Sequence, residues 1–284
     1  LLLRPIWTRK PAFRPCPAWP PPRNDNPAVK HQLSPTLTYD RAFQPAVVGG
    51  GIFFGSSSED AVICLDASTG AEKWRFVAEG PVRLAPVVLG GRVYVGSDDG
   101  RVYCLDASVG EKLWEYRVDK GEDRRLCGNG RVISPWAVRC GICVEDGVLY
   151  AAAGVLPRLG AVLFALDAQA GTELWRRKIG WTPQGFMLLS SQRVFVPTGR
   201  TPFRSFSRRD GKPVSSFGRS NSWGRDLPGG TLALVVNERL ITGPDEGGEL
   251  HLYDAKSSDC MLRVRGRRVI VDGLSTYILR DTSV

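Results

Sequence analysis

The chain has 284 residues, of which 43% are hydrophobic and 24% are charged, and its formal net charge is +9. This length suits either two ordinary domains or one large β domain, and no apolar run approaches the roughly 18 to 20 residues of a transmembrane helix. The positive charge favours anionic partners, but no zinc-finger, RRM-like or helix-turn-helix signature accompanies it, so we expect no nucleic-acid partner.

Residues 1–30 are expected to form a disordered, proline-rich linker. Prolines stand at positions 5, 11, 15, 17, 20, 21, 22 and 27, a density that precludes continuous helix or sheet. A recognition segment for a proline-binding module is the alternative interpretation. The opening run Leu1-Leu2-Leu3 is too short for a signal-peptide core, and without an initiator methionine the chain is expected to be a fragment.

An eleven-residue pattern then recurs along the chain. It reads CLDASTGAEKW at 64–74, CLDASVGEKLW at 104–114 and ALDAQAGTELW at 165–175, with weaker copies SFSRRDGKPVS at 205–215 and LYDAKSSDCML at 252–262. Two short apolar runs separated by a turn precede each copy, most clearly in PVVLGGRVYVG at 86–96. Such runs are typical of hairpins, so each unit is predicted to be a four-stranded antiparallel sheet of about forty residues.

A sheet this thin has to stack against neighbours, and a radial array of blades is the economical solution. The predicted fold is therefore an all-β β-propeller over residues 31–284, with about five and a half blades. Its blades are placed at about 45–78, 85–118, 138–179, 186–218 and 232–264, with a partial blade at 268–284. Because 61 residues rather than 40 separate Asp106 from Asp167, an insertion precedes the third blade.

The pattern A-x-D-x-x-x-G-x-x-x-W resembles the docking motif of the PQQ-type β-propeller repeat, found in quinoprotein dehydrogenases and in BamB-like non-catalytic relatives. Its small, acidic, glycine and tryptophan positions are filled by Cys64, Cys104 and Ala165, by Asp66, Asp106 and Asp167, by Gly70, Gly110 and Gly171, and by Trp74, Trp114 and Trp175. We expect each indole to pack against the small residue and the glycine turn of the adjacent sheet. Ser215 and Leu262 replace the tryptophan in the weaker copies.

The resemblance implies two alternative functions. The quinoprotein enzymes hold PQQ beneath an adjacent cysteine pair, beside a calcium ion bound by Glu, Asn and Asp, and no two cysteines are adjacent here. We therefore expect a non-catalytic binding or scaffold module with no catalytic residue, cofactor or metal. The alternative is a PQQ- and calcium-dependent alcohol or sugar dehydrogenase. The resemblance also implies a periplasmic or extracellular location, although free thiols would suit a reducing compartment.

Candidate ligand-binding residues come from two places. Strand alignment puts Arg83, Arg139 and Gln184 where the outer strand of one blade returns to the inner strand of the next, at a channel mouth, so they are expected to converge on an anionic or polar ligand without supporting the fold. The insertion, residues 123–136, adds Arg124, Arg125, Asn129, Arg131 and Trp136.

A long loop absent from sister blades often carries function. A plug for the channel or a cover for a sheet edge is the other interpretation of the insertion. The expected partner is a protein, an anionic small molecule or a glycan. Because Trp136 is assigned to the loop, its removal is expected to cost much less stability than removal of Trp114.

Seven cysteines raise the question of metal or redox chemistry. Cys140 and Cys143 are predicted on the innermost strand of the third blade, where residues three apart face opposite sides, so they are not expected to form a disulfide. Cys64 and Cys104 are interpreted as packed thiols. His31 and His251 are assigned surface or packing roles.

Overall fold

The computed structural model describes residues 4–10, 12–14, 44–128, 131–197, 203–214, 232–243, 248–272 and 275–279. The chain divides into two compact units, Leu1–Gly185 and Phe186–Val284. Within these described ranges the regular structure is β-strand, with one short 3-10 helix, η1 (Pro157–Leu159). This bears out the all-β prediction, and each unit is described below by itself.

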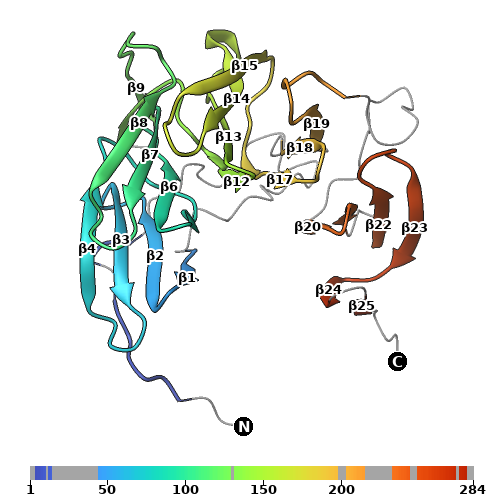
Figure 1. Ribbon diagram of the computed structural model, residues 1–284, viewed down its shortest axis with the longest axis horizontal. Helices are drawn as coiled ribbons and strands as arrows, with labels where there is room; N and C mark the ends of the chain where they lie inside the picture. Colours follow the sequence, from blue (N-terminus) through green and yellow to red (C-terminus); the bar gives the residue numbers. More distant parts are fainter. Residues whose placement is uncertain are drawn as a thin grey trace, which may run out of the picture. The chain divides into compact units, whose positions relative to one another are not determined.

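The first unit contains three four-stranded antiparallel sheets in which the strands follow one another in chain order, and these sheets are the first three blades (Figure 1). The first blade is β1 (Ala46–Val48), β2 (Gly51–Ser56), β3 (Ala61–Asp66) and β4 (Glu72–Val77); the second is β5 (Val87–Leu89), β6 (Arg92–Gly96), β7 (Arg101–Asp106) and β8 (Lys112–Arg117); the third is β12 (Cys143–Glu145), β13 (Val148–Ala153), β14 (Ala161–Asp167) and β15 (Glu173–Ile179). Between the second and third blades lie the hairpin β9 (Leu126–Gly128) and β10 (Arg131–Ile133), and the short strand β11 (Cys140–Gly141).

The second unit repeats this pattern less completely. Strand β16 (Gly185–Phe186) stands at the boundary between the units. In the described residues beyond it, a three-stranded sheet is followed by a four-stranded sheet and a two-stranded hairpin. These are β17 (Leu188–Leu189), β18 (Arg193–Val196) and β19 (Arg204–Ser207); β20 (Leu232–Val236), β21 (Arg239–Gly243), β22 (Glu249–Asp254) and β23 (Cys260–Arg265); and β24 (Arg268–Asp272) with β25 (Ser275–Leu279).

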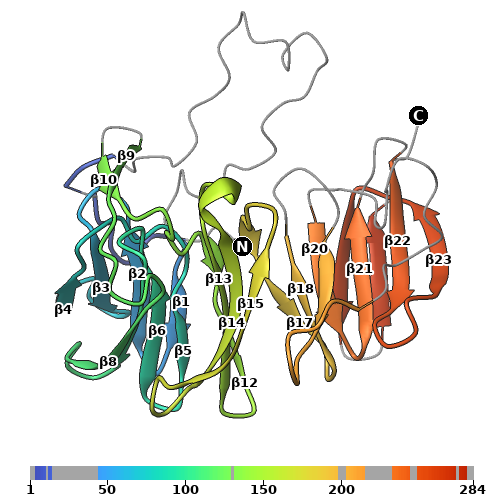
Figure 2. The ribbon, with the colours of Figure 1, turned by 90° about the horizontal axis from the view of Figure 1, so that it is seen from above.

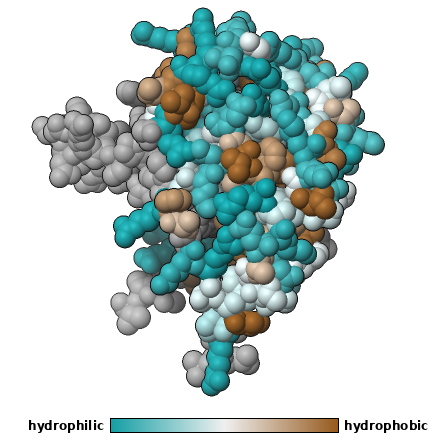
Figure 3. Space-filling model, turned by 90° about the vertical axis from the view of Figure 1, so that its left-hand side faces the viewer, coloured by the Kyte–Doolittle hydropathy of each residue, from teal (hydrophilic) through white to brown (hydrophobic). Residues whose placement is uncertain are grey.

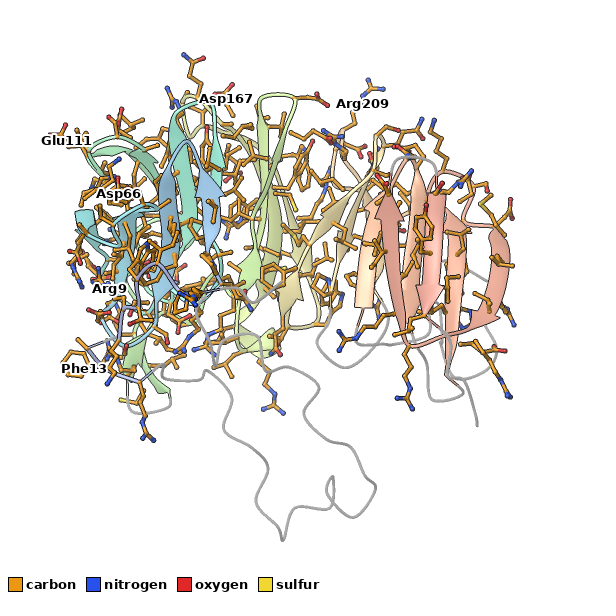
Figure 4. The ribbon with its side chains drawn as sticks, turned by 90° about the horizontal axis from the view of Figure 1, so that it is seen from below. Arg9, Phe13, Asp66, Glu111, Asp167 and Arg209 are labelled. Carbon is orange, nitrogen blue, oxygen red and sulfur yellow. The ribbon has the colours of Figure 1, made fainter. Side chains whose placement is uncertain are left out.

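The recurring motif forms the turn between the third and fourth strands of a blade. Asp66 Oδ1 accepts hydrogen bonds from the backbone N–H groups of Ser68 and Thr69 at 2.9 and 3.0 Å, and the Gly70 N–H donates to the Asp66 carbonyl at 2.8 Å. The Ser68 hydroxyl and these N–H groups lower the pKa of Asp66 to about 2. The aspartates of the first three blades lie at equivalent turns, two of which are marked by Asp66 and Asp167 in Figure 4.

All five copies of the motif make this turn. In each of the other four copies, the N–H of the fifth residue of the turn donates to the carbonyl of the first residue. These pairs are Gly110 and Asp106, Gly171 and Asp167, Gly211 and Ser207, and Ser258 and Asp254. The donor residue has a positive φ each time, 73° at Gly70 and also 73° at Ser258. Only glycine adopts this conformation without a steric penalty, so Ser258 shows that the turn survives in the weakest copy.

The tryptophans of the first two motif copies, Trp74 and Trp114, each join one blade to the next. The Trp74 indole N–H donates to the Ala107 carbonyl of the second blade at 3.0 Å, and a methyl group on Gly110 would come within 2.6 Å of the Trp74 ring. The indole therefore lies flat on a turn that has no room for a side chain, as predicted. The small residue is placed differently: Cys64 lies across from Trp74 in the same sheet. The expectation of a small partner on the adjacent sheet was wrong, because the hairpin register sets this pair within one blade.

Apolar side chains fill the spaces between the blades of the first unit. Val62, Cys64 and Trp74 of the first blade pack with Val95 and Leu105 of the second. Where the tryptophan is missing, burial decreases: Leu262, which replaces it in the fifth copy, is 48% exposed. The other replacement, Ser215, lies outside the described residues. On the side of the first unit that Figure 3 shows, hydrophobic residues at the surface form small patches separated by hydrophilic ones.

A fourth tryptophan, Trp7, docks on the first blade. Its indole N–H donates to the Ala67 carbonyl at 2.9 Å, and Arg9 pairs with Glu72 at 2.7 Å. Both residues belong to the stretch that the sequence analysis interpreted as a proline-rich linker. The composition of that stretch did not reveal these contacts, because Trp7 lies in no recognisable copy of the repeat.

The described cysteines are free thiols, and Cys64, Cys104 and Cys140 are buried, whereas Cys127 and Cys260 are exposed. Burial raises the pKa of each buried thiol, most strongly at Cys140. A raised pKa lowers the thiolate fraction that reacts with alkylating agents.

We expect Cys127 and Cys260 to be alkylated by iodoacetamide in the folded protein and the three buried thiols only after unfolding. Peptide mapping by mass spectrometry measures the modification at each site. After unfolding without reductant, Cys64 and Cys104 are expected to react fully, because facing sheets lie about 10 Å apart and a disulfide needs its Cα atoms within about 7 Å. A mapped Cys64–Cys104 disulfide would contradict the blade arrangement.

Candidate partner-binding site

The antiparallel strand order divides the loops of the first unit between two ends. The turns that carry the docking motif lie at one end of the sheets, and the turns between second and third strands lie at the other. The connections from one blade to the next also lie at this second end, because a fourth strand runs back toward it. Every predicted ligand-binding residue of the first unit belongs to these connections.

Arg83 and Arg139 converge on one buried carboxylate, Asp98. Arg83 Nε lies 2.7 Å from Asp98 Oδ2, and Arg139 Nε and Nη2 lie 2.9 and 2.8 Å from Asp98 Oδ1 and Oδ2. The side chain of Arg83 is 2% exposed, that of Arg139 is 5% exposed and that of Asp98 is 1% exposed. We call this group the Asp98 clamp, since it joins the connection before the second blade to the connection after it.

Backbone hydrogen bonds hold the clamp in place. Asp98 lies in the turn between β6 and β7; its N–H donates to the Pro81 carbonyl at 2.9 Å, and its carbonyl accepts from the Ser134 N–H at 2.7 Å. The Val138 N–H donates to the Ser97 carbonyl at 3.0 Å. The turn is thus bonded to the chain on both sides, and the carboxylate is fixed between the two guanidinium groups.

The burial of the Asp98 clamp overturns one expectation. The arginines were expected to be replaceable by alanine without effect on the fold, but each is buried against a carboxylate that would lose a partner. Gln184, the third residue of the predicted group, is half-buried. It precedes Gly185, whose N–H donates to the Arg139 carbonyl at 3.3 Å. The backbone therefore brings Gln184 beside Arg139.

The insertion is anchored to the first blade by two ion pairs. Arg131 pairs with Asp60, which lies in the turn between β2 and β3, and Arg125 Nη2 lies 3.1 Å from Glu79 Oε2. Arg125 also pairs with Asp123 inside the insertion at 2.9 Å. The hairpin β9–β10 lies at one end of the sheets (Figure 2). It follows the second blade in the sequence but contacts the first blade through Arg131, so the insertion reaches back across the second blade.

Part of the insertion faces solvent. The Arg124 side chain is 59% exposed and lies 3.6 Å from Glu122. Val132, on β10, is 59% exposed, whereas Ile133 beside it is 2% exposed and packs with Leu126, Ala137 and Val155. The hairpin thus has a buried apolar side and an exposed apolar residue, Val132, and the exposed cation of Arg124 lies two residues before the hairpin begins. Asn129, the remaining predicted residue of the insertion, lies outside the described residues.

Trp136 is a core residue. It is 8% exposed and packs in a cluster with Tyr94, Tyr116 and Val138. This burial contradicts the assignment of Trp136 to a loop outside the core, so we no longer expect its removal to cost much less than removal of Trp114. The sequence places Trp136 in a loop, but the loop returns to the second blade at Ser134, so its last residues fill the space between blades.

Sequence reasoning missed the acidic side of this site. Asp98, Asp60 and Glu79 hold the predicted arginines, yet none of the three was among the predicted site residues. Asp98 and Asp99 form an acidic pair in a hairpin turn, and both are buried, although such turns are usually exposed. The sequence feature that could have predicted these ion pairs is the acidic pair Asp98 and Asp99 in a turn, with arginines in the connections before and after its blade.

The described ranges contain neither a cluster of metal-ligating side chains nor a helix that could span a membrane. No group of three or more His, Cys, Asp or Glu side chains there is arranged so that it could hold a metal ion. No helix in the part of the chain that the structure describes has the length and apolar composition to cross a membrane.

Comparison with known proteins supports the repeat assignment. A sequence model of the family described as outer membrane protein assembly factor BamB matches residues 29–260. A search of curated proteins finds no match. Among solved structures, the computationally designed Ika8 protein superimposes with a TM-score of 0.58 at 13% identity, over 83% of this chain and 67% of that protein.

Two natural proteins are also similar. Quinohemoprotein alcohol dehydrogenase ADHIIG from Pseudomonas putida HK5 has a TM-score of 0.57 at 16% identity, over 82% of this chain and 43% of its own. BamB from Moraxella catarrhalis has a TM-score of 0.43 at 16% identity, over 79% of this chain and 77% of its own. The chain thus spans less than half of the dehydrogenase. The first two likenesses, together with the family match, confirm a fold of the β-propeller type.

Proposed function

Because the chain belongs to the BamB family of β-propeller repeat proteins, we propose that it is a non-catalytic module of the cell envelope, periplasmic or extracellular, that binds another protein through the insertion before the third blade. The family description concerns the assembly of outer membrane proteins, which is a function of protein contacts. The bound protein is expected to present an acidic surface with an apolar centre.

The observation that carries the proposal is the way the insertion is fixed. Arg131 pairs with Asp60 of the first blade and Arg125 pairs with Glu79 just after it, so both hold the insertion in place, while the side chains of Arg124 and Val132 are exposed. A fixed loop binds with a smaller entropic cost than a loop that must be ordered. Arginine is a residue type that is enriched at protein interfaces relative to the rest of the surface.

An anionic small molecule or a glycan fits the same site less well. Such a ligand would need convergent cationic groups, and the two arginines that converge, Arg83 and Arg139, already bind Asp98. Replacement of that carboxylate by a ligand would leave Asp98 buried without its partners, which is costly. The proposal therefore places the partner on the insertion and gives the Asp98 clamp a supporting role.

A photo-crosslinking residue at Val132 tests the proposal in the envelope fraction. The control position is Val109, which is 55% exposed but lies in the docking-motif turn at the opposite end of the second blade. We expect a defined protein crosslink at position 132 and none at 109. Arg124→Ala is expected to weaken binding of that protein by about 1.5 to 3 kcal/mol, which is about tenfold or more, and added salt is expected to weaken it further.

Two results would contradict this function. Equal crosslinking at both positions would show that the insertion is not the binding surface. Stoichiometric binding of PQQ in the presence of calcium, together with dye-linked oxidation of alcohols, would favour the dehydrogenase instead. Calorimetry and an activity assay on the purified protein measure these two properties directly.

A further inference from the structure

The N-terminal arm, residues 4–10, reproduces the contact by which one blade docks on the next. The Trp7 indole N–H donates to the Ala67 carbonyl at 2.9 Å, and the Trp74 and Trp114 indoles donate to Ala107 and Ala168 at 3.0 and 3.3 Å. Each acceptor directly follows the motif aspartate of its own blade. The arm thus presents its indole to the first blade as β4 does to the second and β8 does to the third.

The packing of the indole is also the same. A methyl group built on Gly70 would lie 2.6 Å from Cδ2 and Cε3 of Trp7. The same two ring atoms of Trp74 lie 2.6 Å from a methyl group on Gly110, and the pair Trp114 and Gly171 gives 2.6 and 2.7 Å. Such agreement at three sites indicates a defined docking surface rather than an incidental contact. On the first blade, this surface consists of Ala67, Gly70 and Glu72, and we call it the first-blade groove.

A second contact follows at a fixed distance along the chain. Arg9, two residues after Trp7, pairs with Glu72, which is two residues after Gly70. Tyr116, two residues after Trp114, donates its hydroxyl to Glu173, two residues after Gly171. On the first and third blades, a hydrogen-bond donor two positions after the tryptophan thus meets a glutamate two positions after the glycine, whereas the second blade has Phe76 and Lys112 at these positions. On the first blade the acceptor is a carboxylate, so the preferred donor is a cation.

We propose that the first-blade groove is a binding site for an extended protein segment with the pattern Trp-x-Arg or Trp-x-Lys, and that the chain's own arm occupies it in cis. This site lies at the motif end of the first blade, and its existence does not depend on the function proposed for the insertion. Figure 4 shows Arg9 on the first blade, below Asp66 in this view.

The cis contact is built so that another segment can replace it. Trp7 is half-buried, as Trp114 is, but the other described residues of the arm are exposed. The Arg9–Glu72 pair is about one-third exposed on both sides, at 30 and 32%, so it adds little stability. Residues 4–10 form no strand pairing in the structure. The arm gains mainly from its covalent connection, which raises its effective concentration.

A labelled peptide covering residues 4–14, RPIWTRKPAFR, tests the site by fluorescence anisotropy with the full chain. Trp7→Ala removes the cis occupant, and that variant is expected to bind the peptide saturably. The wild type is expected to bind at least about tenfold more weakly, because its own arm competes. Trp19→Ala removes an indole from the same proline-rich stretch but keeps Trp7, so it is expected to behave like the wild type.

Two more reagents separate groove binding from unspecific adhesion. A peptide with alanine in place of the tryptophan is expected not to bind, and Glu72→Gln in the Trp7→Ala background is expected to weaken binding of the original peptide. Equal binding by wild type and Trp7→Ala, or no saturable binding to a Trp7→Ala variant that keeps the wild-type circular dichroism spectrum, would overturn the proposal. A wild-type dimer that the peptide dissociates would overturn the cis assignment, since the occupant would then be the arm of a second copy.

Discussion

Asp98→Ala is expected to lower the free energy of unfolding by about 3 to 5 kcal/mol, the usual cost of removing one member of a buried ion pair. The carboxylate is 1% exposed and binds two guanidinium groups that are themselves buried. Its loss would leave Arg83 and Arg139 charged in a site from which water is excluded, and would release the connections on both sides of the second blade.

Chemical denaturation followed by tryptophan fluorescence measures the effect. Asp123→Ala is the matched control, because Asp123 also binds arginines but its side chain is 62% exposed. Its cost is expected to stay below about 1 kcal/mol. Replacing the whole clamp by apolar residues, Asp98→Leu with Arg83→Met and Arg139→Met, is expected to recover much of the loss. Similar losses for Asp98→Ala and Asp123→Ala would show that the clamp is not the buried group described here.

The Asp98 clamp also shows where sequence reasoning reached its limit. Strand alignment placed Arg83 and Arg139 in equivalent connections, and the structure brings them together. The alignment gave no information on what lies between them, because Asp98 comes from a different turn, 15 residues from Arg83 and 41 from Arg139. Repeats predict what every blade shares, and the clamp is not part of the shared motif.

The docking turns could be predicted because local physical constraints, repeated in each copy, determine which residue type fits each position. Gly70 and Gly110 adopt positive φ and lie under an indole, so two independent constraints fix the residue type. Trp7 and Trp136 escaped prediction for the opposite reason. Neither lies in a copy of the repeat, and a tryptophan in a proline-rich stretch or a long loop carries no sign of the surface against which it packs.

Trp114→Ala is expected to cost about 3 to 5 kcal/mol of unfolding free energy, the range for removing a large aromatic side chain from a packed interface. Its indole lies on Gly171, donates to the Ala168 carbonyl at 3.3 Å and lies 6.1 Å from the Tyr94 ring, so it joins the second blade to the third. The loss includes the cavity left between the sheets and the unpaired Ala168 carbonyl.

Two neighbouring substitutions make the test specific, with denaturation midpoints as the measurement. Leu113→Ala changes the adjacent residue on β8, which is 47% exposed, and is expected to cost about 0.5 kcal/mol or less. Trp136→Ala is expected to cost as much as Trp114→Ala, because Trp136 is 8% exposed within the same cluster. If Trp114→Ala were no more harmful than Leu113→Ala, the tryptophan would not hold the blades together. A low cost at Trp136 alone would instead mean that the insertion can leave the core while the blades stay joined.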